Sequence, residues 1–193
     1  MKKPLLFAIA LLALAGCVDS AETYHAQRFD FATQPSVRIN VARVKVVNAY
    51  RPPLAAPNVE QDFPTPPAKA VALWVRQRLQ AAGTQGVLEV TIDDASVREN
   101  KLPVDKSVSG FFTDQQTSRL DARLHVTLRL YTGGDAMSAA SGDITVTRSV
   151  TLNRKASVTD RERAFDDMVA AMMTDFDMQA HDRLNSYFKA YML

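Results

Sequence analysis

Alternating apolar and polar residues predict two strands in the first half of the chain. The first begins at Val37, and its alternation slips by one position after Arg43, which indicates a bulge or a twist in one long strand. The second extends from Leu88 to Asp93. Six of the nine prolines lie between Pro52 and Pro67, so we expect an extended connection there.

The clearest alternation in the chain predicts a β-hairpin. From Arg119 to Tyr131 polar and apolar residues alternate, which is typical of a strand with one buried face and one wet face. A glycine-rich turn follows, and a returning strand is predicted from Ile144 to Leu152. Arg148 interrupts the apolar row of this strand, so we expect it to lie near a sheet end, or the strand to bend there.

Apolar residues at helical spacing predict two amphipathic helices. A Thr-Pro pair at residues 65–66 is a helix-start signal, and the spacing extends this helix from about Pro66 to Ala82. Thr159 and Glu162 match a capping box, and the helical period then continues to the C-terminus. This second helix would have about nine turns, and a break between His181 and Asn185 is left open.

The order of these elements predicts the fold class. It is strand, helix, strand, strand, strand, helix, and the four half-buried strands share an apolar face that two helices must cover. We therefore predict an α+β fold: a two-layer sandwich of a four-stranded mixed sheet with both helices on one face. The first strand, the first helix and the second strand would form a right-handed crossover.

The start of the chain has the pattern of a secretory leader that ends in a cysteine. Lys2 and Lys3 form its basic part, and the apolar run from Leu5 to Leu14 is about ten residues long, which is too short to span a bilayer. We therefore expect a signal peptide over residues 1–16 and no permanent transmembrane helix there.

The residues Leu14, Ala15, Gly16 and Cys17 resemble the bacterial lipobox. In proteins of that class the cysteine thiol receives diacylglycerol, the leader is removed, and the new amino terminus is acylated. The resemblance implies that Cys17 anchors the protein in a membrane, because several acyl chains exceed the two signals that stable anchoring needs. Val18 rather than Asp after the cysteine implies sorting to the outer membrane, facing the periplasm. The alternative is a plain cleaved leader with a spare thiol.

The charge balance changes once the leader is set aside. The 193 residues include 23 basic and 21 acidic side chains, a formal net charge of +2. Lys2 and Lys3 account for the whole excess, so the mature chain has 21 of each and is formally neutral. Its charge therefore gives no support for a nucleic-acid partner. The single cysteine excludes an internal disulfide.

Behind the leader we expect two regions. Residues 17–35 are mostly polar and lack a sustained period, so we interpret them as the lipidated N-terminus and a tether to the domain. Residues 36–193 would form a single α+β domain. The tether contains aromatic residues that are candidates for packing at its far end, namely Tyr24, Phe29 and Phe31.

No catalytic or metal-binding motif is present in the sequence. The chain has three histidines and lacks a zinc-protease helix, a cysteine pair, a nucleophile elbow and a phosphate-binding loop. Asp177 and His181 have ligand-like i, i+4 spacing, but no third ligand can be nominated, and a solvated acidic helix face is the alternative. We therefore predict that the protein is not an enzyme and carries no cofactor or metal.

Two surfaces are candidates for contact with a partner. The outward face of the predicted hairpin carries Arg119, Arg123 and Arg129, joined from the first strand by Arg38, Arg43 and Lys45. These cations would form a plate for anionic headgroups or a protein partner, unless carboxylates on the neighbouring strands neutralise them. The second surface is the connection from Asn100 to Ser118, where Phe111 and Phe112 would form either a docking tip or a cover for the core edge.

Together, the lipobox and the order of elements resemble small periplasm-facing lipoproteins that serve envelope machines. Two kinds are similar: the auxiliary lipoproteins of ABC-type lipid transport systems, and the LPS-assembly lipoprotein that plugs an outer-membrane barrel. The hairpin from Arg119 to Asn153 and the helix after it carry this resemblance. It implies a lipid-anchored scaffold that binds an envelope protein in outer-membrane assembly or lipid transport. The alternative is a binder of a small amphiphile or lipid between sheet and helices.

Overall fold

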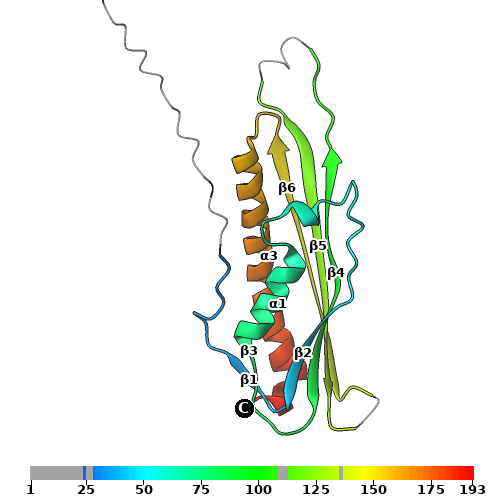
Figure 1. Cartoon of the computed structure of the whole chain (residues 1–193), viewed down its shortest axis with the longest axis vertical. Helices are drawn as coiled ribbons and strands as arrows, with labels where there is room; N and C mark the ends of the chain where they lie inside the picture. The colour runs from blue at the N-terminus through cyan, green and yellow to red at the C-terminus, as the bar shows by residue number, and fades with distance from the viewer. Residues whose placement is uncertain (1–23, 25–27, 108–112, 135–136) are drawn as a thin grey trace, which may run out of the picture.

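A computed structural model describes residues 24, 28–107, 113–134 and 137–193 of the chain. Figure 1 shows two layers, with a tall twisted sheet on one side and both helices on the other. The long elements are β4 (Val87–Lys101), β5 (Gln116–Tyr131), β6 (Ala140–Asn153), α1 (Pro67–Arg78) and α3 (Val158–Tyr187). The short ones are β1 (Val37–Ile39), β2 (Arg43–Asn48), β3 (Leu79–Ala81) and the 3₁₀ turns η1 (Glu60–Asp62) and η2 (Lys189–Tyr191).

The predicted α+β class and the four-stranded mixed sheet are confirmed. The strand order of the main sheet is β2-β4-β5-β6, in which β2 runs parallel to β4 and the other neighbours are antiparallel. Six apolar residues of β5 point into the core and are at most 4% exposed, namely Leu120, Ala122, Leu124, Val126, Leu128 and Leu130. α3 packs on β6, and α1 packs on β4.

The first predicted strand is two strands that belong to different sheets. β1 pairs in parallel with β3 in a small two-stranded sheet, whereas β2 joins the main sheet. The slip in the alternation marks the place where the chain changes sheet, with Val41 only 1% exposed at the crossing. A single bulged strand was therefore the wrong prediction.

The predicted end of the first helix is also wrong. α1 ends at Arg78, four residues before Ala82, because Leu79 is extended, with φ −108° and ψ 122°. The chain continues directly into β3. Apolar residues at helical spacing extended the prediction too far, because the start of β3 happens to keep the same period.

The second predicted strand is much longer than the sequence indicated. β4 has 15 residues and continues past Asp93 to Lys101, where it still pairs with Ser118. The register shifts between Ile92 and Asp94, so the buried residues change parity at this point. The alternation of apolar and polar residues therefore breaks at the bulge, although the strand itself continues.

α3 begins two residues earlier than the predicted capping box. Ser157 is the N-cap: its hydroxyl accepts the backbone N–H of Asp160, whose carboxylate accepts the backbone N–H of Ser157. The pair Thr159–Glu162 is therefore not the cap. The helix is 30 residues long and unbroken through the segment where a break was left open. No helix in the described part of the chain is both long and apolar enough to cross a membrane.

Arg148, which interrupts the apolar row of β6, points toward α3. Its guanidinium forms an ion pair with Asp175 of that helix. The strand continues for five residues beyond Arg148, and β6 is an edge strand of the main sheet, so Arg148 lies at the side edge of the sheet rather than at the end of its strand. A cation fits on the inner face here because it lies at the rim of the layer, 41% exposed, with a carboxylate beside it.

The observed cap leads to a stability prediction. We expect Ser157→Ala to lower the free energy of unfolding by about 1 kcal/mol, because it removes the oxygen that accepts the Asp160 N–H. Thr159→Ala is the matched control, and we expect it to remain within about 0.5 kcal/mol of the wild type. Urea unfolding measures both values. Equal destabilisation by the two variants would contradict the observed cap.

Candidate functional site

The lipobox and the two phenylalanines lie outside the described residues. The structure therefore places neither Cys17 nor its neighbours Leu14, Ala15 and Gly16, and it does not place Phe111 and Phe112. Their roles stay predictions from the sequence as far as the structure is concerned.

The arginines on the outer sheet face lie beside carboxylates. Arg119 lies 2.9 Å from Asp121, and Arg123 lies 3.3 Å from Asp94. The Ser149 hydroxyl and the Arg119 guanidinium together hold the pKa of Asp121 below its usual value. The cationic plate is therefore compensated at two of its three arginines on β5, which fits the neutralised alternative.

Two other members of the plate are placed differently. Arg129 lies directly opposite Glu89 in the register of β4 and β5. Arg38 belongs to β1 and therefore to the small sheet, so the prediction that it joins this face is wrong. Contact of Arg119, Arg123 and Arg129 with a partner stays a prediction.

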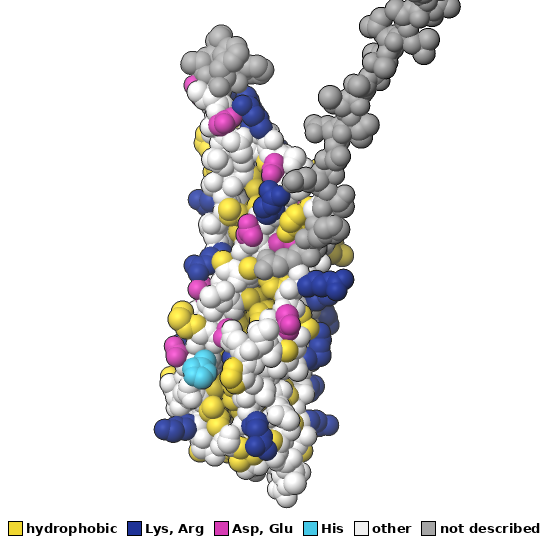
Figure 2. All heavy atoms as spheres, turned by 90° about the vertical axis from the view of Figure 1, so that its left-hand side faces the viewer, with side chains coloured by type: hydrophobic (Ala, Val, Ile, Leu, Met, Phe, Trp, Pro, Cys, Tyr) yellow, Lys and Arg dark blue, Asp and Glu magenta, His cyan; other side chains and the backbone are white. Residues whose placement is uncertain are grey.

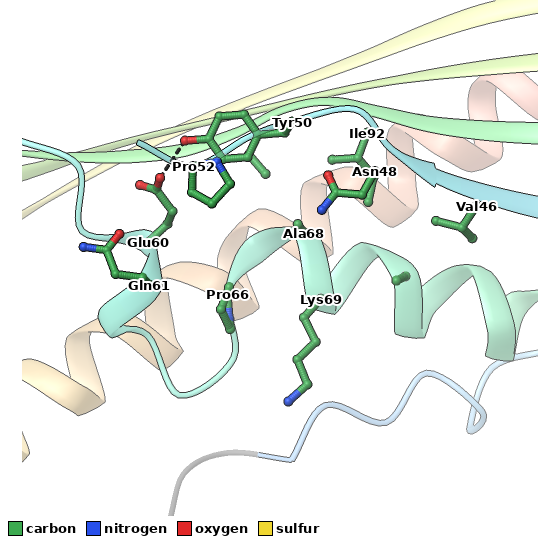
Figure 3. Close-up of a pocket in the computed structure, with 12 residues that line it drawn as sticks. Val46, Asn48, Tyr50, Pro52, Glu60, Gln61, Pro66, Ala68, Lys69 and Ile92 are labelled. Atoms are coloured by element: carbon green, nitrogen blue, oxygen red, sulfur yellow. Dashed lines mark hydrogen bonds between the residues drawn. The ribbon is translucent and has the colours of Figure 1, made fainter. Parts of the chain in front are cut away.

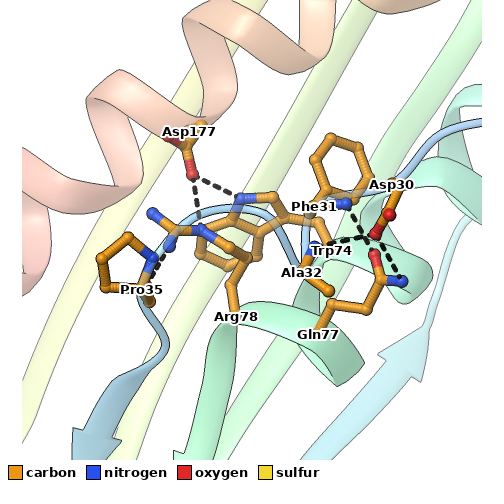
Figure 4. A network of polar contacts seen from close by, with 8 residues as sticks. All are labelled: Asp30, Phe31, Ala32, Pro35, Trp74, Gln77, Arg78 and Asp177. Atoms are coloured by element: carbon orange, nitrogen blue, oxygen red, sulfur yellow. Dashed lines mark hydrogen bonds and ion pairs between the residues drawn. The ribbon is translucent and has the colours of Figure 1, made fainter.

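The helix layer is joined to the N-terminal segment by a polar network (Figure 4). Trp74 donates its indole N–H to Asp177 Oδ1 at 2.7 Å, and Arg78 Nε donates to the same oxygen at 3.1 Å. Arg78 also donates to the carbonyl of Pro35. One carboxylate of α3 therefore holds α1, and through Arg78 it holds the chain that enters β1.

This network includes Asp177, one of the two residues with ligand-like spacing. Its carboxylate is engaged by Trp74 and Arg78, whereas His181 is exposed on α3. Among the described residues no group of three or more His, Cys, Asp or Glu side chains is placed to hold a metal ion. Trp74 and Arg78 are spaced i, i+4, so both donors lie on one face of α1 and reach the same carboxylate. This spacing is visible in the sequence, but it is not a metal-ligand pattern and was not predicted as a site.

A cavity of about 410 Å³ lies between the sheet and the start of α1 (Figure 3). Its walls are mostly apolar and come from β2, β4, α1 and the proline-rich connection, with Val46, Ile92, Ala95, Pro66, Ala68 and Ala72 among them. Lys69 also lines the cavity, but its ammonium points away from the strands in Figure 3. The volume lies within the range of small-molecule sites.

The polar end of this cavity is formed by Glu60, which is 3% exposed. Its carboxylate accepts the Tyr50 hydroxyl at 2.6 Å, the Val97 N–H at 3.1 Å and the Asn58 amide at 3.2 and 3.3 Å. Burial alone would raise the pKa of Glu60, but these hydrogen bonds outweigh it and hold the pKa below its usual value. Since its acceptor sites are occupied, we interpret Glu60 as a clamp that fixes the proline-rich connection on the sheet.

Comparison with known proteins confirms the predicted lipobox. Residues 1–17 match the family model for the prokaryotic membrane lipoprotein lipid attachment site. The match supports the signal peptide and attachment to a membrane of the cell envelope through a lipidated cysteine. No curated protein is significantly similar in sequence.

Several solved structures are similar to the chain. The minor lipoprotein of Acinetobacter baumannii is 12% identical, with 77% of this chain and 96% of that chain covered and a TM-score of 0.39. For rare lipoprotein B of Shewanella oneidensis the identity is 9%, the coverages are 74% and 97%, and the TM-score is 0.33. An uncharacterized lipoprotein B of Nitrosomonas europaea is 13% identical, with 87% of this chain and 94% of that chain covered and a TM-score of 0.38. Likeness at this level does not extend to function.

The clamp leads to a prediction about pH. Because the pKa of Glu60 is lowered in the folded chain, its carboxylate stabilises the fold above the unfolded pKa of about 4.3. This stabilisation is lost as the pH falls through the folded pKa. We therefore expect Glu60→Gln to cost about 1 to 3 kcal/mol at pH 7 and less at pH 3, as measured by urea unfolding. An equal loss at both pH values would contradict this account.

Proposed function

We propose that the protein is a non-enzymatic, lipid-anchored scaffold of the cell envelope that binds a protein partner in outer-membrane assembly or lipid transport. The lipid attachment site supports the anchor. Val18 after the cysteine supports the outer membrane, facing the periplasm. The observation that carries partner binding is the described part of the connection between β4 and β5 (residues 102–107 and 113–115), which lies beyond the N-terminal end of α3 in Figure 1.

The described part of this connection continues strands β4 and β5 beyond the sheet, and we call these strands with their connection the β4–β5 hairpin. Leu102 N–H donates to the Thr117 carbonyl at 2.9 Å, where the ladder ends. Beyond it, Asp105 N–H donates to Gln115 Oε1 at 2.6 Å, and Gln115 Nε2 donates back to the Asp105 carbonyl at 2.9 Å. The described residues of the connection, held in this way, present a defined shape to a partner, which lowers the entropic cost of binding.

A hollow at the base of this hairpin adds apolar surface. Its volume is about 460 Å³, and it lies between the hairpin, the end of β6 and the start of α3. Apolar and basic side chains line it together, including Leu102, Val104, Leu152, Ala156, Lys101, Arg154 and Arg161. An apolar floor with a charged rim is typical of a protein docking surface. Arg119, which lies opposite Asn100 near this end of β5, belongs to the same part of the molecule.

A second candidate function is supported by the cavity beside Glu60. We propose as the alternative that it takes the hydrocarbon chain of a small amphiphile, since it lies between sheet and helix and its walls are mostly apolar. No cation faces the strands there, because Lys69 points away from them (Figure 3). Recognition would therefore rest on the chain rather than on an anionic headgroup.

Site-specific crosslinking in cells tests the scaffold. A photoreactive residue at Val104 or Phe111 should give crosslinks to an envelope protein. The same residue at Met137, which is 82% exposed in the β5–β6 connection at the other end of the sheet, should give none. The Cys17→Ser variant should lose the crosslinks because it loses the anchor. Equal crosslinking from Met137, or none from either hairpin position, would contradict the proposal.

Ligand-dependent stability tests the amphiphile alternative. We expect a single-chain lysophospholipid to raise the melting temperature of the wild type by several degrees, because a ligand that binds only the folded state stabilises it. Ala72→Trp should abolish the shift by filling the cavity, whereas Arg76→Trp on the exposed side of α1 should keep it. Native mass spectrometry would show the bound lipid directly. No bound lipid and no shift in the wild type would exclude this alternative.

A further inference from the structure

The described residues before β1, Tyr24 and residues 28–36, lie against the helix layer. Figure 2 views this side of the molecule, where apolar side chains run along the middle of the face. Four points of the segment touch the two helices or pack on the core, at Tyr24, at Phe29 to Phe31, at Pro35 and at the start of β1. A tether that serves only as a spacer needs no such contacts.

The first contact is a partly buried hydrogen bond to α3. The Tyr24 hydroxyl donates to Asp166 Oδ2 at 2.5 Å, and the Arg163 guanidinium lies 5.9 Å from the centre of the Tyr24 ring. Asp166 is only 1% exposed, and a buried carboxylate is costly without hydrogen-bond donors. Burial and the hydrogen bond to Asp166 raise the pKa of Tyr24 to about 12, so its hydroxyl keeps the proton that it donates at neutral pH.

The next contacts fix the segment to α1. Phe29 and Phe31 stack with ring centres 6.2 Å apart, and both pack against the core. Gln77 accepts the Phe31 N–H at 2.8 Å and donates to Asp30 Oδ1 at 3.3 Å. The Arg78 contact with Pro35 follows, and β1 begins two residues later. The segment is therefore held by α3 at one end and by α1 at the other.

We infer that this segment is a strap docked on α1 and α3, and that it holds the Tyr24 corner of the domain next to the bilayer that anchors Cys17. Tyr24 is seven positions after Cys17, so the chain between them spans at most roughly 25 Å even when fully extended. Released from the helices, the twenty residues from Cys17 to Val37 would span up to roughly 70 Å. Docking therefore reduces the greatest possible distance between Cys17 and the folded domain by more than half. The inference rests on the lipid attachment site.

The docked corner and the hairpin lie at the same end of α3. Arg163 lies over the Tyr24 ring, and two residues earlier Arg161 forms an ion pair with Glu99 near the end of β4. The strap therefore also places the base of the hairpin close to the bilayer. The kind of partner that fits there is a protein embedded in the membrane or lying on it. This consequence rests on the proposed function, whereas the strap itself does not.

Trypsin release from vesicles tests the strap. Between Cys17 and Arg38 the mature chain has one trypsin site, Arg28, and cleavage there frees the domain from the membrane. A docked backbone must detach before it is cut, so release reports undocking. In acylated full-length protein reconstituted in phosphatidylethanolamine–phosphatidylglycerol vesicles, we expect Tyr24→Phe and the double variant Phe29→Ser, Phe31→Ser to be released at least ten times faster than the wild type. Tyr187→Phe, an exposed tyrosine on α3, is the matched control.

Energy transfer to labelled lipids tests the orientation. Single cysteines at Lys106 and Met137 lie beyond opposite ends of β5, whose 16 residues separate its ends by roughly 50 Å. Energy transfer from a dye at Lys106 to the labelled lipids should be strong in the wild type and weaker in the double variant. Energy transfer from a dye at Met137 should be weak in both proteins. Wild-type release as fast as that of the double variant, or equal transfer from both dyes, would overturn the inference. Loss of the hairpin crosslinks with the strap still protected would count against the partner alone.

Discussion

The structure depends on covering one face of a long sheet. Every second residue of β5 from Leu120 to Leu130 is apolar and buried, and the same face continues into β4 and β6, so leaving it in water would forfeit most of the hydrophobic driving force. α3, with 30 residues, lies along β6, and the shorter α1 packs on β4. The seam between the two helices is closed where Trp74 meets Phe176 edge to face, with ring centres 5.0 Å apart. The strap and the proline-rich connection add to this cover, so their positions also follow from the need to bury the sheet.

Three carboxylates, two buried and one half-buried, define how the remaining pieces join. Glu60 holds the proline-rich connection on β4, and Asp177 joins α1 to α3. Asp166 accepts a hydrogen bond from Tyr24 of the N-terminal segment. Each would be costly in an apolar layer without donors, so each accepts a hydrogen bond from a segment distant in sequence. Apolar contact alone tolerates sliding, whereas a satisfied buried charge permits one arrangement. The formally neutral domain therefore uses its charges in specific internal contacts rather than in a field of one sign.

The proposed function and the strap place the anchor and the binding surface at one end of the molecule. The lipid attachment site and the seven residues after it bring the Tyr24 corner to the membrane, and the ion pair of Glu99 with Arg161 joins that corner to the base of the hairpin. A domain held in this way reaches partners at the bilayer surface and not tens of ångströms away. The cavity beside Glu60 is lined by α1 and by the connection before it, so occupation by an amphiphile would not obstruct the hairpin.

Local patterns in the sequence determined the leader, the lipobox, the α+β class, the β5–β6 hairpin and both helices, because these depend on residue type and a constant period. The patterns failed where tertiary contacts override the period: at the change of sheet near Val41, at the bulge after Ile92, and at Leu79, where a helical repeat runs into a strand. Nothing local showed that Tyr24 and Asp166, 142 residues apart, share a hydrogen bond, or that Glu60 lies beside a cavity. Only the folded chain brings such groups together, since the energy that pairs a buried carboxylate with its donors exists only after the layers have excluded water.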